Sequence, residues 1–224
     1  MTVPRVGTYP QRALAVPDGA AELLLIRHGQ SEEYLDGTPF PLVGGHGDPA
    51  LSDLGHDQAA RVCARVAAGG VDAIYVTPLR RTAQTAAPLA TSLGLPVRVE
   101  ADLREVYLGE WEGGAYRKMM ATGHPIARQV LELERWDVIP GAEPAEEFVS
   151  RVTAAVGKLA AAHAGHRVAV FTHGGVIAQV LALASGSRPF AFVGADNASI
   201  STLIVTAEGW WVRGFNDTAH LEAR

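Results

Sequence analysis

The sequence predicts an α/β fold, in which a mostly parallel central sheet is flanked by helices. Two short apolar runs, residues 23–26 and 168–171, stand just ahead of the His-Gly dipeptides that begin at His28 and His173. An apolar run of four followed by turn residues is typical of a buried strand in a parallel sheet. Because open α/β sheets bind ligands beyond the carboxyl ends of their strands, we expect the two histidines to share one site.

Composition and charge exclude several classes of function. The 224 residues are 48% hydrophobic and 19% charged, as in an ordinary globular chain of one larger domain. The formal net charge is −5, and no basic stripe or membrane-length apolar run is present, so neither nucleic-acid nor membrane partners are expected. The only cysteine, Cys63, is predicted to fill the core and cannot form an internal disulfide.

Residues 1–22 are expected to form an N-terminal arm ahead of the first strand. They contain three prolines and two arginines but no apolar core of a secretory signal, which favours a cytoplasmic location. The arm and the pair Trp210-Trp211 are candidate contacts for a homo-oligomer.

The elements between the first strand and the middle of the chain follow in order. Residues 29–50 have the glycine- and proline-rich composition of a loop. Ser52 is predicted to cap a helix that stops at Gly69-Gly70. The next predicted elements are a strand over 73–76, a helix from Leu79 to about Leu93 that Gly94 ends, and a short strand over 97–99.

Residues 102–143 interrupt this alternation of strands and helices. They hold Trp111 and Trp136, several glycines and only weak helical patterns, so we expect an insertion over the site, where specificity is often built. The remaining predicted elements are helices over 145–163 and 176–184 and a final hairpin of 200–205 and 210–215. We therefore predict a single domain over residues 23–224 that carries one insertion.

Ordered sequence blocks resemble a known family. The stretch 25–32, which contains Arg27-His28-Gly29, is similar to the signature of the histidine phosphatase superfamily, the phosphoglycerate-mutase-like proteins. Further similar blocks follow in the family's order at residues 51–59, 77–86, 103–113, 140–143, 172–175 and 216–221. The resemblance implies a three-layer sandwich and an enzyme of phosphoryl transfer, and the run 109–113 looks like the phosphatase branch.

Two arginines are the expected clamp for a phosphoryl group. The chain has neither a Gly-x-x-x-x-Gly-Lys loop nor an aspartate cluster suited to magnesium, so side chains must neutralise the charge and no metal or cofactor is expected. Arg27 and Arg81 each follow a strand, and the guanidinium fork matches two phosphate oxygens. Arg80 competes for the second position, but neighbours on a helix point about 100° apart, and the family pattern selects Arg81.

The resemblance and the chemistry together assign roles to the other site residues. His28 is the predicted nucleophile, since a neutral imidazole nitrogen can attack phosphorus and form a phosphohistidine. His173 is expected to donate to the phosphoryl oxygens, together with amides of the helix that starts at Gly174. Glu105 is the predicted general acid. The resemblance adds Ser31 to the substrate-binding residues.

Other polar residues receive less specific expectations. Glu143 is expected to hold either a histidine or the pocket rim. The Tyr116-Arg117-Lys118 cluster could contact an anionic substrate, but a run of charges is usually a solvated face, and that interpretation is favoured. The remaining histidines are expected on surfaces or in loops: His46, His56, His124, His163, His166 and His220.

Two kinds of reaction and one non-catalytic role remain open. Water attack on the phosphohistidine gives a phosphatase for a small phosphorylated metabolite, whereas attack by another substrate hydroxyl gives a mutase. The similar mutases usually carry an asparagine six residues after the nucleophile, where this chain has Tyr34, and a longer basic insertion, so the phosphatase is favoured. A non-catalytic phospho-ligand binder is disfavoured because every expected site residue is present, and no Gly-x-Ser-x-Gly elbow supports a serine hydrolase.

Overall fold

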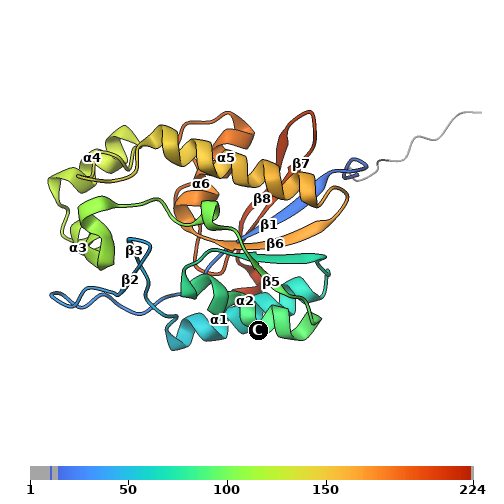
Figure 1. Ribbon diagram of the computed structural model, residues 1–224, viewed down its shortest axis with the longest axis horizontal. Coiled ribbons are helices and arrows are strands. Elements are labelled where there is room, and N and C mark those ends of the chain that lie inside the picture. Colours follow the sequence, from blue (N-terminus) through green and yellow to red (C-terminus); the bar gives the residue numbers. More distant parts are fainter. Residues whose placement is uncertain (1–10, 12–14, 223–224) are drawn as a thin grey trace, which may run out of the picture.

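The computed structural model describes residue 11 and residues 15–222, and a six-stranded mixed sheet forms its centre (Figure 1). The strand order is β5-β4-β6-β1-β7-β8. Strands β5, β4, β6 and β1 are parallel to one another, β7 is antiparallel to β1, and β8 is antiparallel to β7. This arrangement confirms the predicted α/β class. The strands are β1 (Ala21–Arg27), β4 (Ala73–Val76), β5 (Val97–Val99), β6 (Arg167–Thr172), β7 (Ile200–Val205) and β8 (Trp210–Asp217).

The register of the two central strands brings both His-Gly dipeptides to one edge of the sheet. β1 and β6 pair in parallel, with Ile26 opposite Phe171 and Arg27 opposite Thr172. His28 and His173 are therefore the next residues on adjacent strands. The backbone N–H of His28 donates to the carbonyl of Thr172 over 3.0 Å, which ties the two loops together where they leave the sheet.

Side chains of β1 enter two separate cores, one on each face of the sheet. Leu23 and Leu25 pack with α5 (Ala145–Ala162) and α6 (Gly174–Ser185), whereas Leu24 and Ile26 pack with α1 (Asp53–Ala67) and α2 (Arg80–Leu93). Figure 1 shows α5 and α6 above the sheet and α1 and α2 below it. Because alternate residues of a strand point to opposite faces, a strand buried on both faces must be apolar throughout, as the sequence pattern indicated.

The insertion forms a third apolar cluster beside the sheet. We call residues 102–143 the cap. Trp111, Ala127, Val130 and Ile139 form its buried centre, and Trp136 packs against both this cluster and the core under α5 and α6. The cap contains the helices α3 (Ala115–Ala121) and α4 (Pro125–Leu133) and the 3-10 segment η2 (Gly109–Gly114), and the 3-10 segment η1 (Ala101–Leu103) overlaps its start.

The structure differs from the sequence expectations mainly at element boundaries. β1 begins at Ala21, so two residues of the expected arm belong to the sheet, and residues 1–10 and 12–14 of that arm lie outside the described residues. The expected loop 29–50 contains a small hairpin, β2 (Leu42–Val43) with β3 (His46–Gly47). The predicted cap of α1 is confirmed, since the Ser52 side chain accepts from the N–H of Gly55. In the described part of the chain, no helix is long and apolar enough to cross a membrane.

Candidate active site

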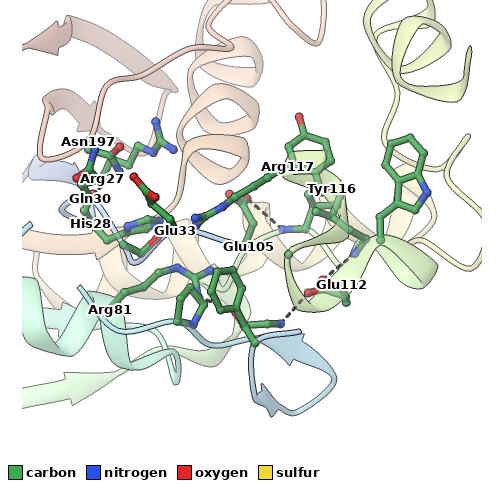
Figure 2. Close-up of a pocket in the computed structure, with 18 of the residues that line it drawn as sticks. Arg27, His28, Gln30, Glu33, Arg81, Glu105, Glu112, Tyr116, Arg117 and Asn197 are labelled. Carbon is green, nitrogen blue, oxygen red and sulfur yellow. Dashed lines mark hydrogen bonds between the residues drawn. The ribbon is translucent and has the colours of Figure 1, made fainter. Parts of the chain in front are cut away.

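A cavity of about 410 Å³ opens where β1, β4 and β6 end, between the sheet and the cap. Arg27, His28 and Arg81 line it from the sheet side, Glu105 from the loop that starts the cap, and Arg117 from α3. Figure 2 shows these side chains around the same space. Four of these five residues were predicted from the sequence to share one site.

The hydrogen bond of His28 determines which ring nitrogen is free. Nδ1 lies 2.8 Å from the carbonyl oxygen of Gly29, and because a carbonyl only accepts, Nδ1 carries the proton. Nε2 therefore holds the lone pair. Burial lowers the pKa of His28 well below its ordinary value of 6.5, and the charges of Arg81 and then Arg27 lower it further. His28 is thus a neutral imidazole with an unprotonated Nε2 at the cavity wall.

His173 lies behind the cavity wall and is fully buried. Its ring centroid is 5.3 Å from that of His28. Nδ1 lies 3.3 Å from Nη2 of Arg81, which can only donate, so Nε2 carries the proton and donates to Oγ1 of Thr77 over 3.0 Å. The predicted substrate contacts His173 and Gly174 are both absent from the cavity lining, and His173 is joined to the cavity through Arg81.

A threonine pair supports this assignment of the His173 proton. The hydroxyl of Thr82 donates to the carbonyl of Leu79 over 2.8 Å, which leaves its oxygen to accept from Thr77 Oγ1 over 3.1 Å. The Thr77 oxygen can then accept from His173. As with His28, burial is the main cause that lowers the pKa of His173 well below 6.5, followed by the charge of Arg81.

Arg81 lines the cavity and Arg80 does not, which agrees with the divergence expected from helical spacing and with the choice of Arg81 from the family pattern. Nη1 of Arg81 donates to the carbonyl of Gly47 over 2.9 Å and lies 4.0 Å from Oδ1 of Asp48. Burial lowers the pKa of Arg81 to about 10, against the opposing charges of Glu105 and Asp48, so the guanidinium stays charged at neutral pH. Arg80 is half exposed, and its Nε donates to the backbone carbonyl of Asp48 over 2.8 Å.

Asp48 connects the β2-β3 hairpin to the start of α2. The helix has no capping side chain of its own, and Oδ1 of the buried Asp48 accepts from the Arg80 N–H over 2.8 Å. This bond satisfies one of the free amides of the first helical turn. Asp48 therefore fixes the turn from which Arg81 reaches the cavity.

Arg27 provides the second positive charge on the sheet side. Its Nη1 donates to the carbonyl of Ala195 over 2.5 Å, and its buried Nε has no hydrogen-bond partner. Burial is the main cause of a lowered pKa for Arg27, opposed by the nearby charges of Glu105 and Asp196. The buried Nε is therefore an unsatisfied donor behind the cavity wall.

Glu105 lies between the cavity and the first turn of α6. Its Oε2 accepts from the N–H of Gly175 over 3.3 Å, and a Cβ at Gly175 would come within 2.5 Å of Oε1, so a side chain there would displace the carboxylate from this position. Arg151 fixes the backbone of the loop that carries Glu105, since Nη2 of Arg151 donates to the Glu105 carbonyl over 3.0 Å. Arg151 in turn pairs with Glu143 over 2.6 Å. Of the two expectations for Glu143, the structure supports the one at the pocket rim.

For Tyr116 and Arg117 the structure favours the alternative that sequence reasoning placed second. The favoured interpretation, a solvated face, is wrong for both, because both line the cavity. Nη2 of Arg117 donates to Oγ of Ser31 over 2.8 Å, and Nη1 donates to the carbonyl of Glu32 over 2.6 Å. Burial raises the pKa of Tyr116 to about 12. Only Lys118 fits the expectation, since it pairs with Asp36 on the exposed side of α3 over 2.7 Å.

Two histidines that were expected on surfaces or in loops are buried instead. His46 packs edge-on against Tyr107 at a centroid distance of 5.3 Å, and His163 lies 3.0 Å from the hydroxyl of Tyr75. His56 and His166 are exposed, and His124 and His220 are half-buried. Within the described ranges, no group of three His, Cys, Asp or Glu side chains is arranged to hold a metal ion.

Comparison with known proteins gives one family and several named relatives. Residues 23–218 match the family model described as histidine phosphatase superfamily (branch 1). A phosphoglycerate mutase-like protein 4 of Arabidopsis thaliana is 32% identical over 90% of this chain and 87% of its own length. A metal-independent phosphoserine phosphatase of the same plant is 28% identical over 93% of this chain and 86% of its own length.

Other matches differ in length or come from solved structures. A bifunctional protein of Mycobacterium tuberculosis is 31% identical over 89% of this chain, which spans only 54% of that relative. The structure of a mycobacterial glucosyl-3-phosphoglycerate phosphatase superimposes with a TM-score of 0.74 at 29% identity, covering 89% of this chain and all of that one.

Proposed function

The chain belongs to the histidine phosphatase superfamily, and we propose that it hydrolyses a small phosphorylated metabolite through a phosphohistidine intermediate without a metal ion. The observation that carries this proposal is the state of His28. Its Nδ1 is committed to the Gly29 carbonyl, and its Nε2 holds a lone pair at the wall of a cavity that also presents Arg27 and Arg81.

In the first step, Nε2 of His28 attacks phosphorus. A P–N bond forms while the ester P–O bond breaks, and the leaving alkoxide takes a proton from Glu105. Arg27 and Arg81 stabilise the charge on the phosphoryl oxygens during the transfer. The product alcohol leaves, and the phosphoryl group remains on Nε2.

In the second step, a water molecule attacks the phosphohistidine. Glu105, now a carboxylate, accepts the proton of the water, the P–N bond breaks, and its electron pair returns to Nε2. Inorganic phosphate leaves and Glu105 is protonated again. In this scheme His173 orients Arg81 through Nδ1, and it can donate to the phosphoryl group only after taking up a proton that the dianion would stabilise.

Relatives and geometry together suggest a class of substrate. Phosphoserine and glucosyl-3-phosphoglycerate, named for two of the similar proteins, both carry a carboxylate besides the phosphate. Arg117 supplies a third cation in the cavity, beyond the two next to His28. We therefore favour a small phosphorylated carboxylic acid. A cytoplasmic location and a homo-oligomer remain predictions.

The mutase is the second candidate, since one relative is named a phosphoglycerate mutase-like protein. A mutase must offer the phosphohistidine a second substrate hydroxyl in preference to water. Tyr34, at the position of the usual mutase asparagine, packs edge-on against Phe40 at 5.9 Å and does not line the cavity. Supplying 3-phosphoglycerate with its bisphosphate separates the two candidates, because a mutase yields 2-phosphoglycerate and a phosphatase yields inorganic phosphate.

The central experiment removes the nucleophile. His28→Ala should abolish turnover and also abolish the acid-labile phosphoryl label that the wild-type protein retains when it is quenched during turnover of a radioactive substrate. Arg80→Ala is the control, since Arg80 lies beside the clamp but outside the cavity. Turnover by His28→Ala at the wild-type rate would refute the proposed mechanism.

A further inference from the structure

A second cavity of about 270 Å³ lies directly beside the active-site cavity. The two cavities share two lining residues, Val106 and Trp136, which therefore form the wall between them. Val106 follows the predicted acid Glu105 in the chain, so the wall stands next to the position at which a leaving group would depart. No step of the proposed reaction uses the second cavity.

The second cavity offers an apolar interior. Phe148, Val149, Pro189 and Phe190 contribute to its lining. Two of its carboxylates are already engaged: Glu143 pairs with Arg151, and Glu134 pairs with Arg188 and accepts from the N–H of Phe190. Arg135 is also paired, with Asp137, and the remaining charged residue of the lining, Glu146, is exposed. The interior between Phe148 and Phe190 therefore suits an alkyl or aromatic group better than an ion.

Trp136 is held in place as part of the wall. Its ring lies 4.8 Å from the ring of Phe190 and 5.9 Å from that of Tyr116, measured between centroids. On either side of it in the chain, Arg135 and Asp137 form an ion pair of 2.6 Å, and the Trp136 carbonyl accepts from the N–H of Ile139. Contacts from α3, from the loop after α6 and from its own turn therefore restrict the indole.

We propose that Trp136 is a specificity-determining residue that limits the size of the leaving group by separating the active site from this second cavity. The inference rests on the proposed function. With the indole in place, the enzyme accepts compact leaving groups. Without it, the two cavities join, and the second becomes a subsite for an extended apolar leaving group.

The test compares primary alkyl phosphates from ethyl to octyl. Their leaving alkoxides have nearly the same basicity, so differences in kcat/KM report how the alkyl chain is accommodated. In the wild-type protein, the ratio of octyl to ethyl phosphate kcat/KM should be below one. In Trp136→Ala, kcat/KM should rise with chain length by up to roughly fourfold for each methylene that enters the apolar cavity.

Two further variants provide a control and an alternative test of the same wall. Trp211→Ala removes an exposed tryptophan of β8 that lines neither cavity, and its chain-length profile should match the wild type. If Trp136→Ala fails to fold, Val106→Ala thins the same wall from the other side and should raise the octyl-to-ethyl ratio in the same direction. An unchanged ratio in the folded Trp136→Ala protein, or in Val106→Ala if that is the one that folds, would overturn the inference.

Binding of alkyl phosphonates separates this inference from the proposed function. These analogues cannot be hydrolysed, so calorimetry measures their affinity without turnover. A wild-type protein that hydrolyses none of the phosphates would contradict the proposed function, whereas the gain in octyl over ethyl phosphonate affinity in Trp136→Ala would still support the wall. Equal phosphonate profiles in the two proteins would reject the wall even if hydrolysis is confirmed.

Discussion

Individual side chains at the site are distinguished by which of their atoms are already engaged. Nδ1 of His28 and Nε2 of His173 carry protons bound to acceptors of the protein, so the lone pair lies on Nε2 in His28 and on Nδ1 in His173, where it accepts from Arg81. Glu105 accepts from a helix amide at Gly175, which orients one oxygen and leaves the carboxyl group at the cavity wall. The atom of each side chain that is not already hydrogen-bonded determines which chemistry that residue can perform.

Replacing Glu105 by Gln should slow hydrolysis according to the leaving group. Glycerol phosphate needs proton donation to its alkoxide, whereas p-nitrophenolate departs without help, so kcat/KM should fall by about 10²–10⁴ for the first and far less for the second. The ratio of the two kcat/KM values is the measurement, and it cancels errors in active-enzyme concentration. Arg81→Ala is the comparison variant, since it contacts the group common to both substrates and should lower both rates. Equal losses with Glu105→Gln would remove Glu105 as the acid.

Lowered histidine pKa values should make the folded protein less stable in mild acid. Below pH 6.5 the unfolded chain protonates His28 and His173, whereas the folded protein keeps both neutral to a much lower pH. The unfolded state then binds more protons, so the free energy of unfolding falls as pH falls through this window, and neither histidine contributes to the pH dependence well above it.

The variant His28→Gln tests this linkage, since it keeps an amide donor but cannot titrate. Between pH 7.5 and 5.5, one histidine with an unfolded pKa of 6.5 should account for about 1.4 kcal/mol of lost stability. Urea unfolding measures the free energy of unfolding at both pH values. The decrease from pH 7.5 to pH 5.5 should be smaller by this amount in His28→Gln than in the wild type, and the m values should be equal. The same loss in both proteins would show that His28 titrates alike in the folded and unfolded states.

Secondary-structure elements were predictable where a local pattern decides them. The central residues of β1 and β6, 23–26 and 168–171, are apolar because both faces of each strand enter a core, and Ser52 caps α1 through its own side chain. The helical repeat allowed only one of Arg80 and Arg81 to enter the site, and the family resemblance selected Arg81. These features depend on residues close in the sequence, and each was found.

Elements whose position depends on distant contacts were not predictable. The short α3 has no fully buried residue of its own, and Arg117 joins it to Ser31 and Glu32, more than 80 positions away. The sequence around Tyr116 therefore looks like a solvated charged helix. For the same reason the burial of His46, which depends on Tyr107 of the cap, was missed.

Arg117 of α3 should recognise a carboxylate on the substrate. O-phosphoserine and O-phosphoethanolamine differ only by that group, so the wild-type protein should prefer phosphoserine in kcat/KM. A hydrogen bond to a charged group is worth about 1.5–3 kcal/mol, and Arg117→Ala should therefore reduce the preference by roughly 10- to 100-fold. Lys118→Ala removes the same charge from the exposed side of α3 and should keep the preference. If Arg117→Ala kept the wild-type preference for phosphoserine, another residue would have to recognise the carboxylate.

The acidic chain gathers three arginines in one cavity, where Glu33, Glu105 and Glu112 also line the wall. The chain carries a formal net charge of −5, yet three arginines, Arg27, Arg81 and Arg117, line one cavity of about 410 Å³. Because these guanidinium groups lie in a partly enclosed site, their effect on a dianion is greater than it would be on the surface. The fold thus gathers the positive charge that phosphoryl transfer needs from β1, α2 and the cap.

This source of charge predicts that a divalent ion is not required. Activity toward p-nitrophenyl phosphate should persist after exhaustive EDTA treatment and dialysis, and added Mg²⁺ or Zn²⁺ should not raise it. Arg81→Ala, treated in the same way, should stay impaired whichever ion is added, because a free cation does not reproduce a donor fixed by Gly47 and Asp48. Loss of wild-type activity on chelation, with recovery on adding a metal, would instead make His46 and Asp48 the first candidate ligands, since both lie on the hairpin segment that contacts Arg81. The arginines would then position the phosphoryl group, and the metal ion would share in neutralising its negative charge.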